Sequence, residues 1–150
     1  MFNVIIFFIV GLILYHVSKY DIKTLKIRVE YILIVLCLGL LFYWLNKGEF
    51  MLLVSNFVIL NFIFLIAIFF DMGIGDLLLI YAFCPYFLNE DYLKIFLLIF
   101  LIATAIWTVY QIDKYNFWHN KKELLRMRFA FCPPICTGFI GFCIYFLYQS

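Results

Sequence analysis

Two aspartates are the residues of this chain whose type and setting could do chemistry. Asp21 lies in the segment SKYDIKTLKIR, and Asp76 closes the sequence DMGIGD between two apolar segments. An unpaired carboxylate is costly in or near the hydrocarbon of a membrane, which suggests a function for each. Two carboxyl groups that meet can share one proton, so that the ionised group activates a water molecule and the protonated group polarises a carbonyl. We therefore expect aspartic-peptidase chemistry if the fold brings Asp21 and Asp76 together.

The composition places these aspartates in an integral membrane protein. Of 150 residues, 68% are hydrophobic and 23% aromatic, whereas 13% are charged, which is too apolar for a soluble domain. The formal net charge of +2 is small and scattered along the chain, so no nucleic-acid partner is expected. The five cysteines lie in apolar stretches without a CxxC pair. We interpret them as buried apolar residues and expect no metal ion or other cofactor.

The apolar segments predict an all-α fold. A spanning helix needs about 20 mostly apolar residues, and this length predicts spans at Phe2–Tyr20, Val29–Leu45, Phe50–Phe70, Tyr92–Tyr110 and Phe129–Tyr148. A shorter segment, Leu77–Leu88, would be about 18 Å long as a helix, against a hydrocarbon core of about 30 Å. Two interpretations of this segment compete, a re-entrant hairpin and a short spanning helix.

The basic residues favour six spans over five. Nine of the 11 Lys and Arg residues lie in two connections, residues 19–28 and 111–128. Six spans place both connections on one side of the membrane, which the positive-inside rule makes the cytoplasm, whereas five spans and a hairpin would separate them. We therefore predict a single domain over residues 1–150 with six transmembrane helices, a short fourth helix and both termini outside. Asp21 and the DMGIGD turn then lie on the cytoplasmic side.

The turn that carries Asp76 contains further residues of interest. Gly73 and Gly75 would let the backbone take positive φ angles and pass close to a substrate strand. A non-helical turn at membrane depth needs a wet cavity or protein around it, and we expect Asp76 to lie in such a turn. Asp71, in the same turn, is the rival for the catalytic role, and we interpret it as a carboxylate that ends the third helix in interfacial water.

Three segments together resemble a known family. GIGD, residues 73–76, looks like the GxGD motif of intramembrane aspartic peptidases. YDIKTLKIR resembles the first-aspartate region of the type IV prepilin peptidase and preflagellin (prearchaellin) peptidase family. FCPPICTG, residues 131–138, is similar to the F-x-P-x-x-x-x-G segment that opens the last helix of that family. The resemblance implies that Asp21 and Asp76 are the catalytic pair and that Gly73 and Gly75 shape the loop of the second aspartate.

The chain also departs from the family pattern. Ile27, Arg28 and Val29 stand where the family often has Ile-Pro-Asn, and Leu78 stands where it often has a lysine. These departures bear on substrate contacts rather than on the aspartates. The cysteine-rich cytoplasmic insert of many bacterial members is absent. The resemblance therefore implies peptidase activity without N-methylation, as in a compact archaeal-type member.

Two classes of function follow from these observations. The first is a membrane aspartic endopeptidase that cleaves the leader peptide of prepilin-like or preflagellin-like precursors at the cytoplasmic face of the plasma membrane, with these precursors and the lipid bilayer as its partners. Proteolysis of other membrane segments stays open within this class. The alternative is a non-enzymatic polytopic membrane protein, a transporter subunit or an assembly partner. A transport path predicts ionisable residues near mid-span, and the predicted spans contain almost none.

Overall fold

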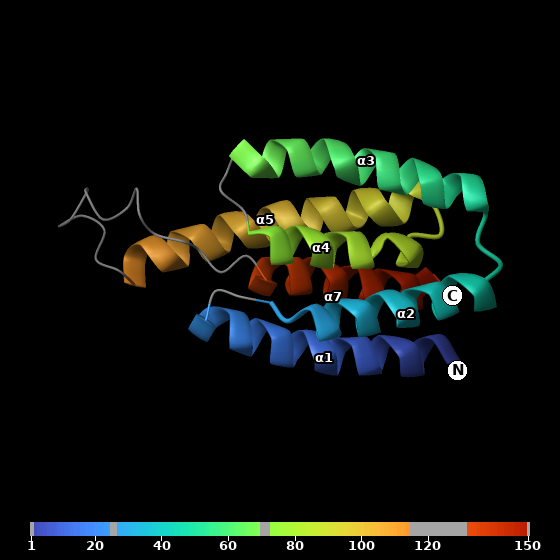
Figure 1. Ribbon diagram of the computed structural model, residues 1–150, viewed down its shortest axis with the longest axis horizontal. Helices are drawn as coiled ribbons and strands as arrows, with labels where there is room; N and C mark the ends of the chain where they lie inside the picture. Colours follow the sequence, from blue (N-terminus) through green and yellow to red (C-terminus); the bar gives the residue numbers. More distant parts are fainter. Residues whose placement is uncertain (1, 25–26, 70–72, 115–131, 150) are drawn as a thin grey trace.

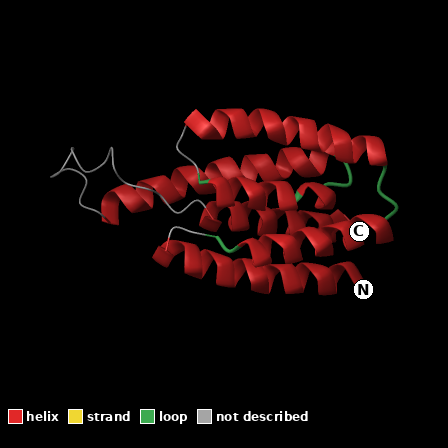
Figure 2. Ribbon diagram, viewed as in Figure 1, coloured by secondary structure: helices red, strands yellow, loops and turns green. Residues whose placement is uncertain are grey.

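The regular structure of the chain is helical wherever it is described. The computed structural model describes residues 2–24, 27–69, 73–114 and 132–149, and within these ranges helices are joined by short turns (Figure 2). In chain order the elements are α1 (Phe2–Thr24), α2 (Val29–Leu45), α3 (Phe50–Phe69), α4 (Ile74–Ala82), the 3₁₀ helix η1 (Cys84–Tyr86), α5 (Glu90–Lys114) and α7 (Cys132–Gln149). The predicted all-α fold class is confirmed for these residues.

The α-helices lie side by side and alternate in direction (Figure 1). Helices α1, α3 and α5 run toward one end of the bundle, and α2, α4 and α7 run back from it. The two chain ends lie together at the opposite end. The last turn of α1 and the first turns of α4 and α7 therefore share one end, which we call the aspartate end because Asp21 and Asp76 lie in these turns of α1 and α4.

Among the described residues, three helices are long and apolar enough to cross a membrane. They are Phe2–Ile22 in α1, Glu90–Gln111 in α5 and Cys132–Gln149 in α7, whereas Val29–Leu45 and Ile74–Tyr86 are shorter apolar segments. Large apolar side chains are exposed along these helices, among them Phe8 at 67%, Leu101 at 63% and Ile144 at 66%. A surface this apolar suits contact with lipid rather than with water.

The short fourth segment is not one helix, contrary to the prediction for Leu77–Leu88. Helix α4 ends at Ala82, and the chain continues as η1 around Pro85. Proline lacks a backbone N–H, and its ring clashes with the carbonyl of the preceding turn, so an α-helix cannot continue through it unchanged. Together α4 and η1 run in one direction, from the aspartate end toward the start of α5 (Figure 1). The segment therefore does not fold back as a re-entrant hairpin.

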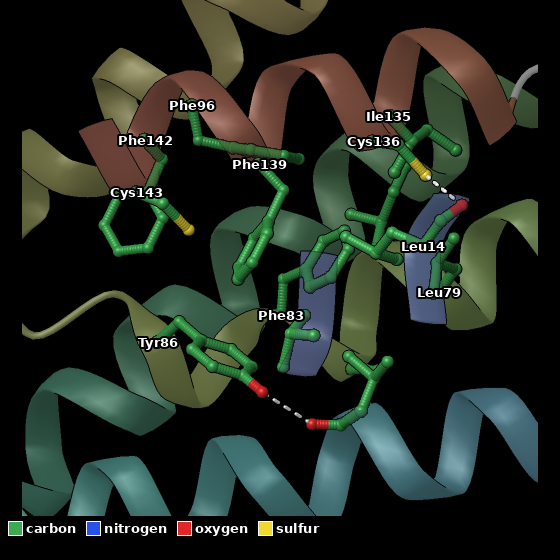
Figure 3. Close-up of a cluster of buried hydrophobic side chains, with 14 of the residues drawn as sticks. Leu14, Leu79, Phe83, Tyr86, Phe96, Ile135, Cys136, Phe139, Phe142 and Cys143 are labelled. Carbon is green, nitrogen blue, oxygen red and sulfur yellow. Dashed lines mark hydrogen bonds between the residues drawn. The ribbon is translucent and has the colours of Figure 1, made fainter. Parts of the chain in front are cut away.

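An aromatic core holds α4 and η1 between α2 and α7 (Figure 3). Phe83 stacks on Phe139 of α7 with ring centroids 4.2 Å apart. The hydroxyl of Tyr86 donates a 2.9 Å hydrogen bond to the carbonyl of Val35 in α2. A Cβ atom at Gly39 would lie 2.6 Å from Cε2 of Tyr86, so α2 approaches this ring more closely than any larger residue would permit. These contacts fix the position of α4 and, with it, of Asp76.

Candidate active site

Asp21 is buried near the C-terminal end of α1, where helix α7 meets it. Only 3% of its surface is exposed. The backbone N–H of Cys132, the first residue of α7, donates a 3.2 Å hydrogen bond to Oδ2 of Asp21. A burial this complete would be costly for a carboxylate without a donor, because it removes the charged group from water. The start of α7 supplies that donor.

The sequence CPP at the start of α7 explains why this particular N–H is available. The first four N–H groups of an α-helix have no partner inside the helix. Pro133 and Pro134 carry no N–H, and their fixed φ suits the first turn of a helix. The N–H of Cys132 therefore remains as a donor that the helix itself does not use. The positive end of the helix dipole adds to its attraction for the Asp21 carboxylate.

Asp76 lies in the first turn of α4 and is also buried, with 7% of its surface exposed. Its carboxyl group accepts a hydrogen bond from the backbone N–H of Gly73, the N-cap residue of this helix, as an acidic residue at the third helical position commonly does. The other oxygen, Oδ1, is fully buried and has no hydrogen-bond partner among the described residues. Among the described residues, one oxygen of the Asp76 carboxyl group thus has a hydrogen-bond donor and the other has none.

The fold brings the two aspartates together. They lie in different helices at the aspartate end of the bundle (Figure 1), and the charge of Asp21 acts on the carboxyl group of Asp76. Helix α7 packs against both α1 and α4, and its first residue bonds to Asp21. Two buried carboxyl groups within electrostatic range hold one proton between them more readily than two negative charges. A pair of carboxyl groups that shares a proton in this way is chemically suited to general acid–base chemistry.

Two predictions about the glycines and the turn are wrong. Asp76 is helical rather than part of a non-helical turn, because α4 already begins at Ile74. The N-cap Gly73 has φ −66° and ψ 144°, and none of the described glycines has a positive φ. Gly75 is needed for space instead, since a Cβ atom there would lie 3.2 Å from Cβ of Ile27. The glycine thus lets α4 approach the segment before α2.

Asp71, the predicted rival, lies outside the described residues, as does most of the basic connection 111–128. Gly138 of the FCPPICTG segment is described, and its role is packing. A Cβ atom there would lie 3.1 Å from Cβ of Phe100 in α5. The glycine therefore permits the close contact between α5 and α7.

The residue that donates its N–H to Asp21, Cys132, also brings its sulfur close to a second cysteine and to a serine. The sulfur of Cys132 lies 3.5 Å from that of Cys136 and 3.7 Å from the hydroxyl oxygen of Ser18 in α1. Four of the five cysteines are buried as predicted, but Cys37 is exposed on α2, because it lies on the helix face away from the bundle. Within the described ranges, no three His, Cys, Asp or Glu side chains gather closely enough to hold a metal ion.

A mostly apolar cavity of about 310 Å³ lies between α1 and α7, apart from the aspartates. Its lining includes Gly11, Phe139 and Ile144 and neither Asp21 nor Asp76. The catalytic candidates therefore do not line this cavity.

Comparisons with protein-family models, with curated proteins and with solved structures find no match to the chain. The function proposed below rests on the residues and their arrangement.

Proposed function

We propose that this protein is a membrane aspartic endopeptidase that resembles the type IV prepilin and preflagellin peptidases. One observation carries the proposal. Asp21 and Asp76, which are distant in sequence, are both buried at one end of a helical bundle, and the charge of one acts on the other. A purely structural helix-end carboxylate is expected to face water instead, as the exposed Asp91 does.

The pair activates one water molecule. The ionised aspartate accepts a proton from the water molecule while the oxygen of that water attacks the scissile carbonyl carbon. The protonated aspartate first donates a hydrogen bond to the carbonyl oxygen and then transfers its proton to it. The tetrahedral intermediate collapses as the aspartate that took the proton from water passes it to the leaving amine nitrogen, and the C–N bond breaks. The other aspartate takes back a proton from a hydroxyl group of the intermediate, which leaves as the new carboxylic acid. Burial around both groups keeps bulk water from competing for these protons.

We infer that the chain crosses the plasma membrane six times, with the aspartate end on the cytoplasmic side. Prepilin-like or preflagellin-like precursors in the same membrane would meet the aspartates there. The alternating helices support six crossings (Figure 1). The charges support the orientation. At the opposite end of the bundle, Lys47 and Lys94 lie beside the acidic residues Glu49, Glu90 and Asp91. The other nine basic residues belong to the two connections at the aspartate end, and an excess of basic residues marks the cytoplasmic side of a membrane protein.

The position of the pair supports the proposed substrate class. A site at the end of an apolar bundle suits a precursor whose apolar helix stays in the bilayer while its leader peptide reaches the aspartates. Prepilin-like and preflagellin-like precursors have this form. The chain has no cysteine-rich insert, so the proposed activity is leader removal without N-methylation.

Mass-spectrometric detection of leader removal tests this proposal. Membranes carrying the native chain, Asp21→Asn or Asp76→Asn are incubated with a panel of prepilin-like and archaellin-like precursors. We expect the native chain to cleave and both variants to be inactive. Asp91→Asn is the matched control, since Asp91 is exposed and pairs with Lys94 at 3.0 Å at the far end of the bundle, and it should retain activity.

Two results would overturn the proposal. The first is full cleavage by either variant of the pair. The second is a folded native chain that cleaves no member of the panel, which would favour the non-enzymatic alternative. Asp71→Asn belongs in the same experiment. If Asp71→Asn is inactive while Asp76→Asn still cleaves, the second catalytic role belongs to Asp71.

A further inference from the structure

Each aspartate accepts one backbone N–H at the start of a helix, and the two differ in their remaining oxygens, since Asp76 alone of the pair has a buried oxygen without a partner among the described residues. Asp21 accepts the backbone N–H of Cys132 at 3.2 Å, from the positive end of helix α7. Hydrogen bonds from backbone N–H groups stabilise a carboxylate over its protonated form, and a helix N-terminus adds to this preference. This hydrogen bond therefore offsets part of the cost of burying an ionised Asp21.

The environment of Asp76 is less favourable to a charge. Its Oδ1 atom is fully buried and has no hydrogen-bond partner among the described residues. A buried oxygen without a hydrogen-bond partner costs more free energy when it is charged than when it is neutral. The N–H of Gly73 serves the other side of the group. A proton on Asp76 would remove the charge and would turn its unpaired oxygen into a donor.

Among the described residues, the charged and titratable groups of the elements next to the pair do not reverse this difference. In the described part of α3, no acidic or basic side chain occurs. From the start of α2, the Arg28 guanidinium lies 5.0 Å from the ring centroid of Tyr20, and Glu30 is exposed. Helix α7 contributes the thiols of Cys132 and Cys136. The acidic partner that acts on Asp76 is Asp21.

We propose that the two aspartates have fixed resting roles, with Asp21 ionised and Asp76, whose Oδ1 has no partner among the described residues, holding the shared proton, and that the N-terminus of α7 is the positioning element that stabilises the charge on Asp21. This inference rests on the proposed peptidase function for its meaning, since it makes Asp21 the base that activates water and Asp76 the acid that faces the scissile carbonyl. The protonation states themselves exist without substrate. They can therefore be measured independently of cleavage.

Carbon-13 NMR of the full chain labelled at the aspartate side-chain carboxyl carbon tests the assignment. The sample is the detergent-solubilised protein without substrate near neutral pH, and the native chain is compared with Asp21→Asn and Asp76→Asn. We expect one protonated carboxyl signal in the native chain, which Asp76→Asn removes and Asp21→Asn retains. A signal that Asp21→Asn removes and Asp76→Asn retains overturns the proposal, as does a native chain with every aspartate ionised.

A second pair of variants tests the role of α7. Cys132→Ala keeps the backbone N–H, and the same chain with the α-hydroxy analogue of alanine at position 132 replaces that N–H by an ester oxygen. We expect the ester form to ionise Asp21 at a pH higher by about one unit than Cys132→Ala, because each backbone N–H bond to a carboxylate is worth roughly that much. Equal titration of the two forms overturns the role of α7.

The outcomes separate this inference from the proposed function. A protonated Asp76 in a chain that cleaves no precursor would reject the peptidase and keep the asymmetry. Cleavage that depends on both aspartates, with the proton on Asp21, would keep the peptidase and reject the asymmetry.

Discussion

The backbone N–H of Cys132 donates a 3.2 Å hydrogen bond to Oδ2 of Asp21, although 111 positions separate the two residues in the chain. The contact joins the end of α1 to the beginning of α7. It makes the start of the last helix part of the candidate active site, because any displacement of that helix changes the only hydrogen bond that the described residues give to Asp21.

Two substitutions of Cys132 should separate the effect of its backbone N–H on cleavage from the effect of its thiol. Cys132→Ala retains the N–H, and leader cleavage should stay within a few-fold of the native rate. Cys132→Pro removes the donor and places a ring carbon where the hydrogen bond lies, although proline is tolerated at the first position of a helix. Cleavage should fall by about 10²-fold, the usual effect of a misplaced catalytic group. Kinetics of precursor cleavage, with circular dichroism of both variants, would decide, and equal activities would contradict the role of the backbone contact.

Cleavage by the native chain should have a pH optimum with loss on both sides. At low pH both aspartates bind a proton, so the pair has no base. At high pH both are ionised, so the pair has no acid. Initial rates of leader removal across the pH range give the profile, and thermal stability measured at each pH separates catalysis from unfolding. A rate that stays constant while both groups titrate would exclude a shared proton.

Gly75→Ala should reduce both stability and cleavage. Alanine normally stabilises a helix relative to glycine by about 0.5–1 kcal/mol. At position 75 the new methyl group would lie 3.2 Å from Cβ of Ile27, so the first turn of α4 must shift, at a cost of about 1–3 kcal/mol. Thermal unfolding in detergent measures the effect. Gly11→Ala is the control, because nothing lies within 4 Å of a Cβ atom there, and it should leave stability equal or higher.

Ile27→Ala adds a second check on the same contact. It should restore part of the stability and activity lost in Gly75→Ala, because it removes the side chain that the new methyl group meets. If the two substitutions are additive, the contact between α4 and the segment before α2 does not explain the effect.

Tyr86 should be the strongest single support of the fourth segment. Tyr86→Phe loses the hydrogen bond to the Val35 carbonyl and should cost about 0.5–1.5 kcal/mol. Tyr86→Ala also empties a fully buried ring position and should cost about 3–5 kcal/mol. Denaturant unfolding in mixed micelles gives both values. Similar losses for the two variants would mean that the hydroxyl, and not the ring, holds η1 in place.

Much of the fold could be predicted from apolar runs. Helix α2 begins at Val29 and ends at Leu45, as predicted, and α3 starts at Phe50, as predicted. The reason is that bilayer thickness fixes the length of an apolar segment, and polar residues mark its ends. The number of membrane crossings and their orientation stay predictions, supported by the alternating helices.

The break in the fourth segment could have been predicted more fully. Pro85 is visible in the sequence, and its missing N–H ends α4 before the predicted limit at Leu88. The start of α4 could not be read in this way. Its first residues, Ile74 and Gly75, are apolar and small, and only packing against Ile27 shows why a glycine stands there.

The sequence by itself singled out Asp21 and Asp76 as candidates, because carboxylates are rare among the apolar segments and the basic residues place these two on one side of the membrane, and Asp71 stayed as a rival. Only the tertiary structure decided what surrounds each of them. The packing of α1, α4 and α7 decides which N–H meets Asp21 and which oxygen of Asp76 has no partner among the described residues. The packing of α2 against the bundle decides that Cys37 is exposed. Such contacts join residues far apart in the chain, and local periodicity carries no information about them.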